Sequence, residues 1–121
     1  MYAANRGAAT ANDNGQTVFA GGSNDIAVFR INPQTGEPGL IQNIDTRGFT
    51  PRTCAIDPTG RLLVVGNQVT RRVREGASVI RVPANLSLFR VGDDGRLAFL
   101  RRYDVGVGDR PLWWAGLVAL R

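Results

Sequence analysis

The sequence contains no histidine and no lysine, and its only cysteine is Cys54. Without histidine, Ser-His and Cys-His catalytic pairs and the usual kinds of zinc site are excluded. A single cysteine excludes a disulfide within the chain. Because Cys54 lies in an apolar segment, we expect it to be a small buried side chain rather than a nucleophile. We therefore expect no metal and no cofactor.

Long apolar runs are also missing. The segment from Leu112 to Leu120 is much shorter than the roughly 20 residues that span a bilayer. The first residues, Met1 to Asn5, have neither a charged start nor a long apolar core, so no secretory signal is visible. These absences predict a chain with no membrane partner. They leave the compartment as cytoplasm or periplasm, since a targeting signal could precede Met1, and we expect the cytoplasm.

The formal net charge is +5, and all fifteen cationic residues are arginine. Arginine-rich chains often bind nucleic acid through phosphate contacts. Most of these arginines, however, stand singly at expected strand ends and turns. The only cluster is Arg71-Arg72-Val73-Arg74, followed by Glu75, and no aromatic side chains for base stacking accompany it. The pattern therefore favours a protein without a nucleic-acid partner.

The 121 residues are sufficient for one ordinary domain, and an apolar fraction of 43% is sufficient for a core. Fifteen glycines and six prolines make the chain rich in turns, and no stretch has convincing helical periodicity. The sequence predicts an all-β fold. The expected strands are Met1–Asn5, Asp25–Ile31, Leu40–Ile44, Asn85–Val91, Leu97–Tyr103 and Pro111–Leu120, with long loops over Arg6–Ser23 and Val69–Ala84.

The clearest local pattern is a β-hairpin in Thr50–Gln68. Two apolar runs, Cys54–Ile56 and Leu62–Val65, flank the turn Asp57-Pro58-Thr59-Gly60. Proline fixes its own φ, and glycine tolerates a positive φ, so Asp-Pro-x-Gly is typical of a tight turn. Asp57 is therefore expected to have a structural role.

The two halves of the chain resemble each other. IAVFRI at Ile26 matches LSLFRV at Leu86, and TPRTCA at Thr50 matches RPLWWA at Arg110, with an offset of about sixty residues. Four short strands per repeat predict β-propeller blades. We expect a partial blade in residues 1–49, one complete four-stranded blade in 50–109 and a closing strand in 110–121. A chain that begins and ends within blades is expected to be the C-terminal fragment of a larger propeller.

Three strings occur in a characteristic order: Asn5-Arg6-Gly7, then DIAVFRINPQTG from Asp25, then TPRTCAIDPTGRLLVVGNQ from Thr50. Together they resemble the lactonase family of seven-bladed β-propellers, whose members carry strings close to SNRG, IAVFRIDPATG and TPRHFAIDPSGRFLLVANQ. That family includes propeller-type bacterial 6-phosphogluconolactonases and is similar to fungal carboxymuconate-lactonizing enzymes. The resemblance covers most of the chain outside the two long loops.

This resemblance implies a hydrolase that opens a sugar lactone, or an isomerase of the cycloisomerase type. Arginines would bind the carboxylate or phosphate of a small anionic substrate at the mouth of the central channel. The positions that match the family strings are Arg6, Arg52, Asn67 and Gln68, and these four are the expected substrate contacts. Each also has an ordinary structural explanation; Asn67, for instance, could satisfy loop backbone groups.

The chain departs from the family pattern at two histidines, replaced by Ala8 and Thr53. The acidic residue expected of the family would lie in a blade outside this chain. We therefore expect the isolated chain to be inactive. The alternatives are a non-catalytic propeller that binds a ligand or serves as a scaffold, and an inactive gene fragment. An isolated pair of blades would also expose apolar faces and strand edges, so self-association is expected.

The adjacent tryptophans Trp113 and Trp114 would face opposite sides of the predicted closing strand. One is expected in the core between blades. The other would lie at an exposed edge or at the seam where the ring closes, and a role in stacking on a sugar is a further hypothesis.

Overall fold

The computed structural model describes residues 1–120, and all regular structure in them is β. The fold class predicted from the sequence, all-β and consistent with part of a propeller, is confirmed. The strands are β1 (Tyr2–Arg6), β2 (Ala9–Asp13), β3 (Gln16–Gly21), β4 (Asn24–Ile31), β5 (Pro38–Asp45), β6 (Phe49–Ile56), β7 (Leu62–Val69), β8 (Arg71–Glu75), β9 (Ser78–Val82), β10 (Asn85–Val91) and β11 (Leu97–Asp104).

A four-stranded antiparallel sheet has the order β11-β10-β7-β6. It begins at Phe49, one residue before the segment 50–109 predicted to be a complete blade, and ends at Asp104, inside that segment. Its four strands follow one another in the chain except that the hairpin β8–β9 is inserted between the second and the third. This up-and-down order is the one expected of a propeller blade. The division of the whole chain into blades stays a prediction.

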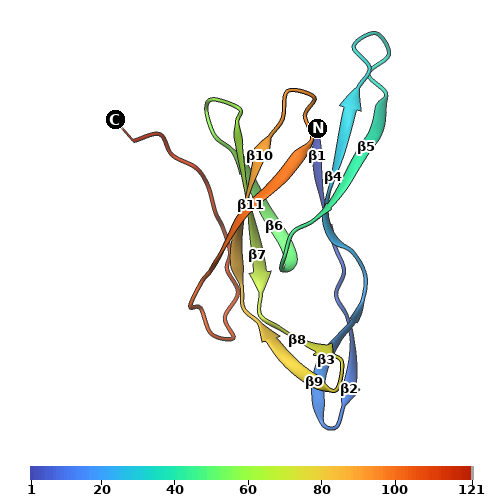
Figure 1. Ribbon diagram of the computed structural model, residues 1–121, viewed down its shortest axis with the longest axis vertical. Coiled ribbons are helices and arrows are strands. Elements are labelled where there is room, and N and C mark those ends of the chain that lie inside the picture. The colour runs from blue at the N-terminus through green and yellow to red at the C-terminus, as the bar shows by residue number, and fades with distance from the viewer. Residues whose placement is uncertain (121) are drawn as a thin grey trace.

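A three-stranded antiparallel sheet has the order β1-β4-β5. It repeats the plan of the other sheet without a counterpart of β6, and the hairpin β2–β3 is inserted at the equivalent place. Figure 1 shows the two sheets side by side, with both inserted hairpins at the same end of the molecule. β1 and β6 are each the edge strand of their sheet. They contact each other but form no hydrogen-bonded ladder.

The core lies between the facing surfaces of these two sheets. Its fully buried members include Ile26 and Val28 from β4, and Leu63, Val65 and Phe89 from the four-stranded sheet. Alternate residues of a strand share a face, which is why these positions are two apart.

Two polar groups cross the same core. The Tyr2 hydroxyl donates to the Gly95 carbonyl at 2.7 Å. The Gln42 side-chain amide donates to the Leu97 carbonyl at 2.9 Å, and its oxygen accepts from the Leu97 amide at 2.8 Å. Hydrogen bonds thus join the two sheets where apolar packing alone would leave polar groups unpaired.

The two segments predicted as long loops are β-hairpins, so that prediction was wrong. Asn14 and Gly15 at the first tip have φ of 50° and 82°, the positive pair that a type I′ turn requires. The sequence pattern that would predict these two hairpins is weak because their strands are short and largely polar. They are stabilised partly by each other: β3 contacts β8, and Arg74 forms an ion pair with Asp13.

The predicted turn at Asp57 is confirmed. Its carboxylate accepts backbone N–H groups of Arg61 at 2.8 Å and Leu62 at 2.7 Å, and the Thr59 hydroxyl at 2.5 Å. These donors, with the Thr59 hydroxyl the strongest, lower the pKa of Asp57 to about 2. Asp57 therefore stays ionised at neutral pH and stabilises the turn, as expected.

The closing strand predicted at Pro111–Leu120 is absent; this stretch has no regular structure. It lies on a face of the four-stranded sheet, where Gly66 leaves room for the methyl group of Ala115. One backbone bond, from Leu112 N–H to the Gln68 carbonyl at 2.7 Å, joins it to the sheet. A segment that crosses a face cannot form a ladder, because ladder bonds run along an edge. A ring-closing role stays a prediction.

Cys54 is exposed, so the prediction that it is a small buried side chain was wrong. It lies on β6, the edge strand of its sheet, and an edge strand is covered from one side only. The surrounding atoms still desolvate the sulfur, which raises the pKa of the Cys54 thiol above its ordinary value. A raised pKa disfavours the thiolate, which is consistent with the expected lack of a nucleophilic role.

Within residues 1–120 there is no helix that could cross a membrane.

Replacing Leu40 by glutamate is expected to reduce self-association. Leu40 is 56% exposed, and it pairs across the strands with Phe29, two residues from the 42%-exposed Ile31. An exposed apolar sheet face of this kind is a surface at which two copies of a chain can associate. We expect the wild-type sedimentation coefficient to rise with protein concentration, and Leu40→Glu to flatten that rise. Gln34→Glu, in the adjacent turn, makes the same charge change as a control. A wild-type chain that stays monomeric at all concentrations would contradict the expectation.

Candidate functional site

Arg6 and Arg52 line one open cavity of about 550 Å³. Arg6 is the last residue of β1, and Arg52 lies on β6, so each sheet contributes one guanidinium. The other lining residues are Ala4, Pro51, Thr53, Trp113 and Trp114. The structure thus brings together two of the four residues expected to contact substrate.

A β-bulge positions Arg52. The pairing of β6 with β7 shifts between Pro51 and Thr53, so Arg52 is an extra residue without a partner on β7. Bulges redirect side chains and often lie beside functional sites. Pro51 is fully buried and anchors the bulge. The Arg52 guanidinium lies 5.1 Å from the centre of the Trp113 ring, a cation–π distance that holds the side chain over the cavity.

Asn24 connects the two strands that carry the arginines. Its side-chain amide donates to the Gly7 carbonyl at 3.2 Å, one residue after Arg6. Its side-chain oxygen accepts the Thr50 backbone N–H at 2.8 Å, two residues before Arg52. Sequence reasoning missed Asn24, because nothing in its position at the start of β4 distinguishes it from an ordinary turn residue.

Backbone strain is stored at the same place. Thr50 has φ of 57°, which is unusual for a β-branched residue and more so for one that precedes proline. Its hydroxyl is buried and has no hydrogen-bond partner among the described residues. Such outliers persist only where the surroundings hold them, and they cluster at functional sites. Here the Asn24 bond holds the strained backbone that leads into Arg52.

Close packing fixes the backbone beside Arg6. Gly7 N–H donates to the Ser23 carbonyl at 2.5 Å, and a Cβ at Gly7 would collide with the backbone of Gly22. Only glycine fits at Gly7, which gives a physical reason for the glycine that follows Arg6.

The cavity is electropositive. No acidic residue lines it, and neither Arg6 nor Arg52 makes an ion pair with any residue from 1 to 120. Two unpaired guanidiniums in one cavity can bind a carboxylate or phosphate bidentately. Trp113 and Trp114 are both exposed, so the expectation that one of them lies in the core between blades was wrong. Their rings add apolar surface to the cavity, as the hypothesis of sugar stacking requires.

Asn67 does not line this cavity. It is fully buried, and its amide donates to the Thr46 carbonyl at 2.9 Å, Asn85 Oδ1 at 2.7 Å and the Ser87 hydroxyl at 3.3 Å. We call Thr46, Asn67, Asn85 and Ser87 the polar cluster. The structure thus gives Asn67 a place within the fold that differs from the expected contact with substrate.

Gln68 does not line the cavity either. It is 8% exposed, and its backbone carbonyl accepts the N–H of Leu112. Successive strand residues point to opposite faces, so Gln68 lies under the C-terminal segment while Asn67 faces the core. Of the four expected contacts, only the two arginines therefore share a surface.

Acid and base groups are missing from the site. Asp45, Asp57 and Asp104 do not line the cavity, and the described residues contain no group of three or more histidine, cysteine, aspartate or glutamate side chains that could hold a metal ion. The arrangement can bind and orient an anion. Proton transfer would need a group from elsewhere.

Comparison with known proteins decides the family. The family described as "Lactonase, 7-bladed beta-propeller" matches residues 1–79, about two thirds of the chain, including both arginines. The chain belongs to this lactonase family. The match ends within β9, while β10 and β11 complete the same four-stranded sheet.

Two relatives of this lactonase-family chain are proteins named 6-phosphogluconolactonase. The one from Bacillus subtilis (strain 168) is 35% identical over 80 residues, which cover 65% of this chain and 19% of the relative. The one from Formosa agariphila (strain DSM 15362 / KCTC 12365 / LMG 23005 / KMM 3901 / M-2Alg 35-1) is 34% identical over 73 residues, which cover 60% of this chain and 17% of the relative. The chain thus spans less than a fifth of each relative. No solved structure gives a significant match.

Proposed function

We propose that this lactonase-family chain binds the anionic group of a sugar lactone in its arginine cavity and takes part in hydrolysing the lactone. The observation that carries the proposal is that Arg6 and Arg52, from separate sheets, converge on one cavity free of acidic residues. The relatives named 6-phosphogluconolactonase support a phosphorylated sugar lactone as the substrate. Such an activity belongs to carbohydrate metabolism.

The chemistry divides between binding and proton transfer. Hydrolysis adds water to the lactone carbonyl and breaks the ring C–O bond, which gives a carboxylate and a hydroxyl. Arg6 and Arg52 would hold the phosphate or the developing carboxylate. A base for the water and an acid for the ring oxygen would have to come from outside residues 1–120. We therefore propose that turnover needs more of the propeller than this chain supplies.

A second candidate is ligand binding without turnover. The absence of histidine from the sequence and of acidic residues from the cavity lining favours it. A pH-stat assay with gluconolactone and 6-phosphogluconolactone separates the two candidates. A rate above the spontaneous one, with the chain alone or in a longer propeller that contains it, supports the hydrolase. No added rate from either protein, combined with retained binding, supports the second candidate.

Arg52→Gln is expected to weaken binding of 6-phosphogluconate, the stable hydrolysis product, by about tenfold to a hundredfold. The reason is that the substitution removes a charged hydrogen-bond donor, and such bonds contribute about 1.5–3 kcal/mol. Trp113 and Trp114 are the only tryptophans, and both line the cavity, so a titration of intrinsic fluorescence reports binding directly.

Arg90→Gln is the matched control, because Arg90 is an exposed arginine that does not line the cavity. It is expected to leave the affinity unchanged. Equal affinities for the wild type, Arg52→Gln and Arg90→Gln would contradict the assignment of the cavity.

A further inference from the structure

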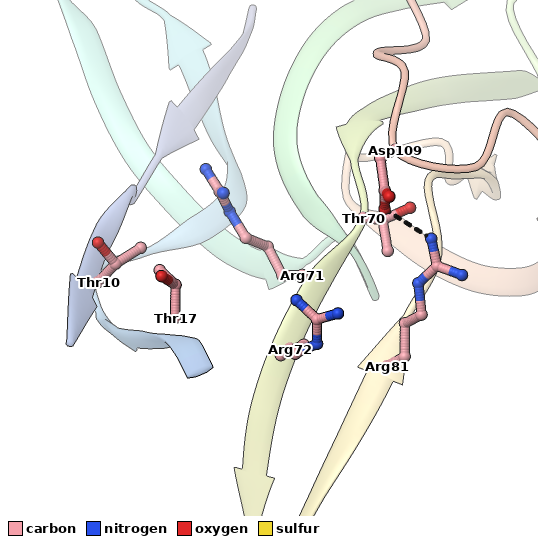
Figure 2. A pocket seen from close by; sticks show the side chains of 7 residues that line it. All are labelled: Thr10, Thr17, Thr70, Arg71, Arg72, Arg81 and Asp109. Atoms are coloured by element: carbon pink, nitrogen blue, oxygen red, sulfur yellow. Dashed lines mark hydrogen bonds and ion pairs between the residues drawn. The ribbon is translucent and has the colours of Figure 1, made fainter. Parts of the chain in front are cut away.

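Arg71 and Arg72, from the arginine cluster of the sequence, line a second cavity, which shares no residue with the first. Its volume is about 120 Å³, well above the roughly 10–15 Å³ needed for one water molecule. Figure 2 shows Arg71, Arg72 and Arg81 from the hairpin β8–β9 around it, with Thr10 and Thr17 of the other hairpin beside Arg71. The junction of the two inserted hairpins thus places three guanidiniums and two hydroxyls around one space.

Two of these arginines form a like-charged pair within the hairpin. Arg72 and Arg81 are directly opposite each other in the register of β8 and β9. Like charges opposite each other in a strand pair destabilise it unless something neutralises them. An anion between the two side chains would convert this repulsion into attraction.

Arg71 has an unused donor. Its Nε is buried and has no hydrogen-bond partner within residues 1–120. A buried polar atom without a partner costs free energy, so its presence needs an explanation. Figure 2 places the Arg71 side chain above Thr10 and Thr17 in the cavity.

One carboxylate partly neutralises the cavity. Asp109 accepts a bond from Arg81 at 2.8 Å, but its side chain is 95% exposed, so solvent weakens the pair. The other nearby acid, Asp13, is paired with Arg74 and does not line the cavity. Three arginines against one exposed carboxylate leave an excess of two positive charges.

We propose that this cavity is a binding site for a phosphate-type oxyanion. Arginine guanidiniums match phosphate oxygens bidentately, and the threonine hydroxyls can donate to the remaining oxygens. The anion would neutralise the Arg72–Arg81 pair and join the two hairpins. The site is separate from the cavity of Arg6 and Arg52, and its occupancy does not depend on lactone hydrolysis.

Isothermal titration with inorganic phosphate tests the site in the full chain. Wild-type protein is expected to bind phosphate, with an affinity that falls as sodium chloride rises. Arg72→Gln is expected to weaken binding about tenfold, a change of about 1.4 kcal/mol. Asp109→Asn is expected to tighten binding about threefold, because it frees Arg81. Arg90→Gln, outside both cavities, is expected to change nothing.

Arg72→Gln and Asp109→Asn are expected to change the phosphate affinity in opposite directions, so a loss of folding alone cannot produce both results. Because Asp109 is exposed, Asp109→Asn is expected to fold even where Arg72→Gln does not, and circular dichroism checks both. No phosphate binding by the wild type, no tightening in Asp109→Asn, or weakening by Arg90→Gln equal to that by Arg72→Gln would overturn the site. Sulfate is expected to compete with phosphate; acetate binding as tightly as phosphate would overturn the phosphate-type assignment.

Discussion

Phe89→Ala is expected to lower the free energy of unfolding by about 3–5 kcal/mol. Phe89 is fully buried in the core between the two sheets. Its ring packs edge-on against the ring of Phe99, with 5.7 Å between the ring centres. Removing the ring loses its transfer free energy and leaves a cavity that the β ladders on both sides of β10 prevent from closing. For a domain of this size such a loss is a large fraction of the total stability.

Urea unfolding followed by tryptophan fluorescence and circular dichroism measures this change. Leu100→Ala is the control, because Leu100 is 45% exposed on the outer strand β11 and its loss is expected to cost less than about 1 kcal/mol. Similar losses for the two variants would show that the face-to-face packing of the sheets does not hold the fold together.

Asn67→Asp is expected to make the stability strongly dependent on pH. The substitution keeps the shape of the side chain but replaces the Nδ2 donor with oxygen, facing the Thr46 carbonyl, Asn85 Oδ1 and the Ser87 hydroxyl. A carboxylate there is buried among oxygen atoms, so burial and missing donors raise the pKa of the new carboxyl in the folded state.

The direction follows from proton linkage. The unfolded carboxyl releases its proton near pH 3.9, while the folded one keeps it to a higher pH. Between these two pKa values the folded state binds more protons than the unfolded state. The free energy of unfolding therefore falls by about 1.4 kcal/mol for each unit by which the pH rises. Below pH 3.9 the variant is expected to be at its most stable relative to the wild type.

Urea unfolding of the variant and the wild type, at several pH values from 4 to 7, measures the difference. Subtracting the wild type removes the contribution of other groups, including Asp57. Asn43→Asp is a matched control, because Asn43 is an exposed residue of β5. A difference that does not change with pH would mean that position 67 is open to solvent and that the polar cluster is not formed.

The parts of the fold that the sequence predicted rest on local chemistry. The turn at Asp57 depends on four adjacent residues, and strands such as β4 and β10 carry clear apolar alternation. Arg6 and Arg52 could be proposed as a pair because each follows a recognisable string. Their convergence was an inference from the family fold, and the structure supplied the geometry.

The parts that sequence reasoning missed depend on contacts between distant segments. Asn24 has its role only because Gly7 and Thr50 come within reach of one amide. Asn67 matches a family string, yet its environment of Thr46, Asn85 and Ser87 is assembled from separate elements. The C-terminal segment is as apolar as a strand, but it crosses a sheet face instead of an edge, and no local pattern distinguishes the two.

The contact between the inserted hairpins has a consequence for how this chain can vary. β3 contacts β8, and Asp13 of the first hairpin forms an ion pair with Arg74 of the second. Lengthening one hairpin, or reversing the charge at one end of the ion pair, therefore displaces the other hairpin. We expect a substitution in one of these hairpins to be compensated by a substitution in the other. The two hairpins, although far apart in the sequence, would then vary together.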